Sequence, residues 1–132
     1  MRRIVVDASA ALHLLSSGTP LGDPNDTAFV APPLLWSEVT SALHEAVWRG
    51  AITQELADDV RRRLDGAPIE RKALSELYER AWTTADEFGW AKTYDAEYVA
   101  LAALLGCPLL TVDARLARTA SRVVQLLAPA DL

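Results

Sequence analysis

The chain has 132 residues, of which 51% are hydrophobic, and its net charge is −5. This size and composition predict a single domain over residues 1–132, and no apolar stretch reaches the ~20 residues that a membrane-spanning helix needs. We therefore expect a cytoplasmic protein that does not contact a membrane. The negative charge argues against a generally basic nucleic-acid surface. Because Cys107 is the only cysteine, we expect no cysteine-based metal site.

In chain order, the first predicted element is a strand over residues 4–6, where three apolar residues stand in a row. Residues 16–26 are dense in Gly, Pro, Asn and Asp, which predicts a surface loop. A second apolar run predicts a strand at 29–31. The apolar spacing of residues 34–50 then predicts a helix that ends at Gly50.

The second half of the chain continues this alternation. Helices are predicted over residues 53–64, 75–88 and 94–105, with Thr53 as an N-cap. Strands are predicted at 108–113 and 123–127. Short strands that alternate with helices predict an α/β fold with a central parallel sheet of four to five strands and helices on both faces.

Four acidic residues stand at positions where their side chains could meet. Asp7 closes the first apolar run and Asp113 closes a later one, and the carboxyl ends of parallel strands open into the crevice where ligands bind. Glu38 borders the apolar stripe of its helix, about 60° from the centre of the stripe. Asp95 lies in the first turn of a helix rich in small residues. Taken singly, Asp95 could complement the helix dipole and Glu38 could be solvated.

Four converging carboxylates raise an electrostatic problem. Two of them about 4 Å apart repel by ~1 kcal/mol in water and by ~4 kcal/mol at the effective dielectric of a protein surface. None of the four acids stands directly beside a basic residue in the sequence, so a divalent ion is the simpler hypothesis. Oxygen ligands favour Mg²⁺ or Mn²⁺, and such an ion suits phosphodiester hydrolysis because it lowers the pKa of its bound water.

Two hydroxyl residues accompany these acids. Thr111 lies two positions before Asp113 on a predicted strand, so both side chains share a face, and the hydroxyl could bond to Asp113 or to a metal-bound water. Ser9 follows Asp7 by two positions. It could cap the following helix or support the metal site, and the sequence favours neither role.

Four segments together carry a family signature in their order and spacing: IVVDASAAL at the start, SEV around Glu38, TYDAEYVALAALLGCPLLTVDARLA over residues 93–117, and the closing VVQLL. This set resembles the PIN-domain ribonucleases, and specifically the VapC toxins of bacterial toxin–antitoxin pairs. The resemblance covers essentially the full chain. It implies a PIN-like fold and a Mg²⁺- or Mn²⁺-dependent endoribonuclease that acts on RNA.

The resemblance also implies roles for residues and partners. Asp7, Glu38, Asp95 and Asp113 match the four catalytic, metal-binding acids of the family, with Ser9 and Thr111 as polar support. The protein is expected to be a homodimer that a cognate antitoxin neutralises, and to reach DNA only through that antitoxin. Glu97 is left out of the site because it lies two positions, or roughly 160° around the helix, away from Asp95.

Other functions remain open at this point. A PIN-fold binding module could act mainly through an antitoxin complex on DNA. A phosphoryl-accepting receiver domain is disfavoured because the last predicted strand lacks a lysine, and a haloacid-type phosphatase because Ser9 stands where a second acid is needed.

The four tryptophans, Trp36, Trp48, Trp82 and Trp90, could stack on unpaired bases, although packing is their ordinary role. Trp36 and Trp48, on the helix that carries Glu38, are candidate contacts for the antitoxin or a second subunit.

Overall fold

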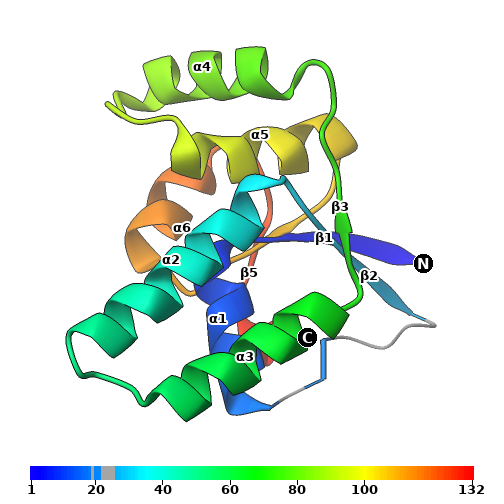
Figure 1. The fold of residues 1–132 in the computed structure, drawn as a ribbon. Coiled ribbons are helices and arrows are strands. Elements are labelled where there is room, and N and C mark those ends of the chain that lie inside the picture. Colours follow the sequence, from blue (N-terminus) through cyan, green and yellow to red (C-terminus); the bar gives the residue numbers. More distant parts are fainter. Residues whose placement is uncertain (19, 22–25) are drawn as a thin grey trace.

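A parallel sheet lies at the centre of the structure, a computed structural model that describes residues 1–18, 20–21 and 26–132 (Figure 1). In these residues the sheet has five strands in the order β3-β2-β1-β4-β5. The strands are β1 (Arg2–Val6), β2 (Thr27–Ala31), β3 (Ile69–Arg71), β4 (Leu109–Leu110) and β5 (Leu126–Leu127). The predicted α/β fold and the size of its sheet are therefore confirmed.

Six α-helices connect these strands in the described part of the chain. They are α1 (Ala8–Ser17), α2 (Leu34–Trp48), α3 (Gln54–Gly66), α4 (Leu77–Phe88), α5 (Tyr94–Leu105) and α6 (Ala114–Ala120). The chain moves outward from β1 to β3 and then returns to β4 and β5, so right-handed crossovers place the first three helices on one face and the later three on the other. Helices α1, α2 and α3 contact one another, whereas α5 contacts α4, β1 and β4 (Figure 1).

The element boundaries differ from the sequence-based expectations in a few places. Strands β4 and β5 have two residues each, fewer than the predicted runs at 108–113 and 123–127. Strand β3 was not predicted, because two of its three residues are charged and exposed at the sheet edge. Residues 16 and 17 of the predicted loop belong to α1, and residues 19 and 22–25 of that loop lie outside the described residues.

The helix ends follow the expected capping chemistry. The Thr53 side chain accepts a hydrogen bond from the Leu56 amide at 3.1 Å and so caps α3. Helices α4 and α5 end at Gly89 and Gly106, which adopt left-handed φ values of 70° and 64°. Helix α2 ends at Trp48, two residues before Gly50.

The core determines where the acidic residues can lie. Ile4, Val5 and Val6 are fully buried in β1, and α5 is buried from Ala96 to Ala102 because it lies between the sheet and α4. The small residues of α5 permit this close packing on two sides. Within the described residues, no helix combines the length and the apolar character needed to cross a bilayer.

Candidate active site

Asp7 lies at the centre of the candidate site and is held by both backbone and side-chain contacts. It follows the buried end of β1 and is the N-cap of α1, where its Oδ1 accepts a hydrogen bond from the Ala10 amide at 2.8 Å. The Asp7 amide donates to the Leu110 carbonyl at 3.1 Å and so ties this residue to β4. Beside β1 the strand order reverses, which is where α/β sheets bind ligands. With 4% of its surface exposed, Asp7 has little freedom to move.

The two hydroxyl residues join the ends of β1 and β4. Ser9 Oγ donates to Asp7 Oδ1 at 2.7 Å, lies 3.3 Å from Thr111 Oγ1 and accepts from the Val112 amide at 3.2 Å. Thr111 Oγ1 accepts from the Asp113 amide at 3.0 Å. The helix cap is therefore Asp7, and Ser9 supports the Asp7 carboxylate.

Asp113 resembles Asp7 in its local structure. It is the N-cap of α6, and its Oδ1 accepts hydrogen bonds from the amides of Arg115 at 2.9 Å and Leu116 at 3.3 Å. Thr111 bonds to Asp113 through the backbone, because its Oγ1 accepts a hydrogen bond from the Asp113 amide and not from the Asp113 side chain. Both aspartates thus follow a strand of the central sheet and start the next helix, with one carboxylate oxygen used for capping.

Glu38 reaches the site from α2 and is held by a tyrosine of α5. Tyr98 Oη donates to Glu38 Oε1 at 2.5 Å, and Tyr98 itself is only 1% exposed. Burial and the carboxylate of Glu38 raise the pKa of Tyr98 far above its ordinary value, so Tyr98 remains a donor. Tyr98 was not predicted from the sequence. Its spacing of three residues after Asp95 on one helix was the available signal, because such residues share a face.

Electrostatic interactions connect all four predicted acids. Burial raises the pKa of Asp7 above 3.8, the hydrogen bonds from Thr111, Ala10 and Ser9 oppose this shift, and the charge of Asp95 adds to it. Burial also raises the pKa of Asp95, as does the charge of Asp113. These carboxylates are therefore near enough to influence one another's ionisation.

Glu38 belongs to the same group of interacting acids. Burial raises the pKa of its carboxyl, the hydrogen bond from Tyr98 lowers it, and the charges of Asp95 and Asp7 raise it. Glu97, which was expected to point away, is also buried, and the charge of Glu38 adds to the effect of burial in raising its pKa. Glu97 therefore takes part in the electrostatics of this region, even though its angle from Asp95 on α5 had excluded it from the predicted site.

The carboxylates fit a hard divalent cation by their chemistry, since all the donors are oxygen atoms and their like charges disfavour full ionisation. In the part of the chain that the structure describes, no three histidine, cysteine or acidic side chains already stand together as a set able to hold an ion. The side chains would therefore have to draw together around one. A basic group is nearer than expected, because the Arg115 charge lowers the pKa of Asp95.

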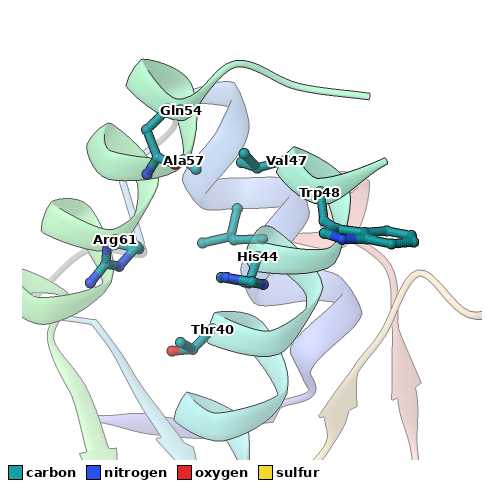
Figure 2. A pocket seen from close by; sticks show the side chains of 8 residues that line it. Thr40, His44, Val47, Trp48, Gln54, Ala57 and Arg61 are labelled. Carbon is teal, nitrogen blue, oxygen red and sulfur yellow. The ribbon is translucent and has the colours of Figure 1, made fainter. Parts of the chain in front are cut away.

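Two of the cavities in the described part of the chain are lined by residues named above. One of about 370 Å³ lies beside the acids and is lined by Trp90, Asp95, Asp113, Arg115, Arg118 and Thr119. The other, of about 340 Å³, lies between α2 and α3 (Figure 2). His44 lines this second cavity, and His13 is exposed on α1. Neither histidine belongs to the acidic group.

Comparison with known proteins extends these observations. The family model of the PIN domain matches residues 4–122. Ribonuclease VapC3 of Mycobacterium tuberculosis is 37% identical over 121 residues, which cover 88% of this chain and 86% of that protein. Ribonuclease VapC9 of the same organism is 38% identical over 125 residues, which cover 88% of this chain and 90% of that protein.

Two solved structures share the fold at low identity. The protein PAE2754 from Pyrobaculum aerophilum superposes with a TM-score of 0.72 at 21% identity, covering 98% of this chain and 92% of that chain. A chain of VapBC2 from Rickettsia felis, crystallised with a DNA fragment from the promoter, gives a TM-score of 0.65 at 9% identity, with 96% and 98% covered.

Proposed function

Because the chain belongs to the PIN-domain family, and within it to the VapC ribonucleases, we propose that it is a metal-dependent endoribonuclease and the toxin of a toxin–antitoxin pair. The observation that carries this proposal is the electrostatic coupling of Asp7, Glu38, Asp95 and Asp113 beside the reversal of the strand order. These acids come from four separate parts of the chain. Their substrate would be a phosphodiester bond of cytoplasmic RNA.

Asp7, Asp95 and Asp113 would hold Mg²⁺ or Mn²⁺, and Glu38 would assist them. When bound, the ion would neutralise their repulsion, lower the pKa of a water molecule and stabilise negative charge on the phosphate. Asp7 and Asp113 each keep one oxygen for this role, because only Oδ1 of each caps a helix among the described contacts. Ser9 and Thr111 fix the distance between the ends of β1 and β4, which carry these two aspartates.

Glu38 is suited to take a proton from the attacking water. Tyr98 occupies its Oε1, and among the described residues no hydrogen bond is made to its Oε2. A half-buried carboxylate with a raised pKa is a stronger base than an exposed one. The Tyr98 hydroxyl fixes the orientation of Glu38, so Oε2 is the oxygen that would accept the proton.

The proposed partners are a cognate antitoxin and a second copy of the chain, with DNA reached only through the antitoxin. VapBC2 from Rickettsia felis is a complex that was crystallised on promoter DNA. In this chain, Trp48 is 82% exposed at the end of α2, and Figure 2 shows its ring extending away from α3. Trp36 is less available, because the Arg71 guanidinium lies 4.4 Å from the centre of its ring. Trp48 is therefore the stronger of the two candidate contacts.

The decisive experiment is cleavage of cellular RNA by purified, antitoxin-free protein. We expect cleavage with Mg²⁺ or Mn²⁺, none with a chelator, and none by Asp7→Asn. Asp86→Asn is the matched control, because Asp86 is exposed on α4 and away from the acidic group. If wild type cuts no RNA, or if Asp7→Asn cuts as well as wild type, the ribonuclease proposal is wrong and a binding module that acts through its antitoxin becomes the better explanation.

A further inference from the structure

The cavity beside Asp95 and Asp113 contains groups that the proposed cleavage chemistry does not use. We call it the α6 cavity, because Arg115, Arg118 and Thr119 of α6 line it. Trp90 closes another side, from the connection between α4 and α5. The cavity thus combines two cationic side chains and an aromatic ring with two of the candidate catalytic acids.

The two arginines of the α6 cavity are free to bind a ligand. Arg115 and Arg118 are exposed and three positions apart on one helix, so they share a face. Neither forms an ion pair within the residues that the structure describes. The arginines of α3 differ in this respect. They pair with Asp58 or Asp59 on their own helix, as in the 2.6 Å contact between Arg63 and Asp59.

Trp90 is held in place on the side that faces the protein. Its ring centre lies 4.9 Å from that of Phe88, and its amide donates to the Ala85 carbonyl at 2.9 Å. It is half-buried, so part of the ring remains available to the cavity. An aromatic side chain that is already fixed loses little conformational entropy when a base stacks on it. Trp82, by contrast, is 66% exposed on α4 and does not line this cavity.

Electrostatics favour cationic side chains beside the acids, in addition to the ion that the acids would hold. The chain carries a net charge of −5, and four carboxylates gather where a phosphodiester would have to bind. Without nearby positive charge, an RNA strand would be repelled on approach. Arg115 and Arg118 supply that charge in a planar form that binds phosphate oxygens in pairs.

We propose that the α6 cavity binds the nucleotide next to the scissile bond of single-stranded RNA, with Arg118 and Arg115 on its phosphate and Trp90 stacked on its base. This inference rests on the proposed ribonuclease function and extends it to the recognition of the substrate. The α6 cavity should therefore prefer unpaired RNA, because a base within a duplex has no free face for Trp90. An acidic segment of the antitoxin is the competing occupant, but it would not use the aromatic face.

The first test is RNA binding by full-length protein with the Asp7→Asn substitution, which prevents cleavage, in the presence of Mg²⁺. The probe is a fluorescent single-stranded oligoribonucleotide of mixed sequence, and the readout is anisotropy. We expect Trp90→Leu and Arg118→Gln each to weaken binding roughly tenfold, and Trp90→Phe to restore most of the affinity. Arg118→Gln should also lower the slope of log K against log salt by about 0.7. Trp82→Leu and Arg122→Gln are the matched controls and should bind like the parent.

The second test is cleavage kinetics in the wild-type background. Contacts that hold RNA equally in the ground and transition states affect KM and not kcat. We therefore expect Arg118→Gln and Trp90→Leu to raise KM roughly tenfold with kcat nearly unchanged. Trp90→Leu could lower stability through its contact with Phe88, so Arg118→Gln and Trp90→Phe, which leave the packing largely intact, keep the test conclusive.

The outcomes separate this inference from the proposed function. If wild type cleaves RNA, but KM and RNA affinity are unchanged in Arg118→Gln and Trp90→Leu, the α6 cavity does not bind RNA and the proposed ribonuclease function stands. If RNA binding depends on these residues but wild type cleaves no RNA, the proposed ribonuclease function is wrong and RNA binding by the α6 cavity stands. Loss of antitoxin affinity in Arg118→Gln with RNA affinity unchanged would assign the cavity to the antitoxin and overturn its role in RNA binding.

Discussion

The hydroxyl of Tyr98 donates to Oε1 of Glu38 at 2.5 Å and joins α5 to α2 across the candidate site. These residues lie 60 positions apart in the chain. Tyr98 is nearly inaccessible to solvent, whereas Glu38 is half-buried at the edge of the acidic group. The bond therefore extends from the core to a side chain of the proposed active site.

Tyr98→Phe should separate the positioning of Glu38 from its presence. Loss of the donor leaves Oε1 of a half-buried carboxylate unpaired, so we expect the free energy of unfolding to fall by about 1 kcal/mol. We also expect kcat to fall roughly tenfold, because Glu38 loses its fixed orientation. Urea denaturation and single-turnover cleavage measure the two effects. Tyr78→Phe, at a tyrosine that is 62% exposed on α4, is the control, and an unchanged kcat in Tyr98→Phe would argue against a role for Glu38 in proton transfer.

Two substitutions of Asp7 should separate capping from catalysis. Asparagine keeps an oxygen for the Ala10 amide, whereas alanine leaves that amide without its cap. We expect both variants to lose cleavage, but Asp7→Ala to be less stable than Asp7→Asn by about 1 kcal/mol in chemical denaturation. Equal stability of the two variants would show that the hydrogen bond from Ala10 contributes nothing measurable.

The raised pKa of Asp95 predicts an unusual dependence of stability on pH. A carboxyl whose pKa is higher in the folded state than its ordinary 3.8 binds protons more strongly when folded, so its contribution becomes unfavourable as the pH rises above 3.8. In the presence of a chelator, Asp95→Asn should therefore match wild type at the lowest pH and exceed its Tm at neutral pH.

Added Mg²⁺ or Mn²⁺ should reverse this order at neutral pH. The ion binds the folded wild-type site and stabilises it, whereas the variant lacks one of the charged ligands. Thermal denaturation of both proteins between pH 3 and 8, with chelator or with metal, provides the comparison. A metal-free Asp95→Asn protein that is less stable than wild type at neutral pH would contradict the inferred destabilisation of the Asp95 carboxylate by burial and by the charge of Asp113.

Trp48→Ala should affect assembly and leave the fold intact. The side chain is 82% exposed at the end of α2, so its removal costs little internal packing. We expect weaker antitoxin binding or weaker dimerisation, measured by titration calorimetry and by analytical ultracentrifugation. Trp82→Ala, at an exposed tryptophan on α4, is the control. If Trp48→Ala changes neither property, its surface belongs to neither interface.

The sequence predicted the parts of the site that depend on local patterns. Asp7 follows an apolar run, and the strand before it and the helix after it are both local features, so its place at the edge of the sheet could be inferred. The bond between Tyr98 and Glu38 could not, because it depends on how α5 packs across α2. Strand β3 was not predicted because two of its three residues are charged, so it lacks the apolar pattern of a strand. It forms by pairing with β2 at the sheet edge.

Arg115 and Glu97 show the limits of reasoning from single segments. Arg115 stands two positions after Asp113 and was not counted with the acids, yet its charge acts on Asp95 from another helix. Glu97 was excluded by its angle on α5, but α2 brings Glu38 near enough to affect its pKa. In both cases the tertiary arrangement of helices decides which charges interact. Periodicity gives the direction of a side chain on its own helix and does not give its neighbours.

The pairing of β1 with β4 also has a consequence for biosynthesis. Ser9 and Thr111 meet across 102 positions, and the Asp7 amide needs the Leu110 carbonyl as its acceptor. A nascent chain that has not yet emerged as far as β4 lacks this acceptor and lacks Asp113, so it holds only part of the acidic group. Contacts between such distant residues form late, after the loop between them has closed. A ribosome that makes this protein would therefore have to extend synthesis past β4 and Asp113 before the complete acidic group could form beside it.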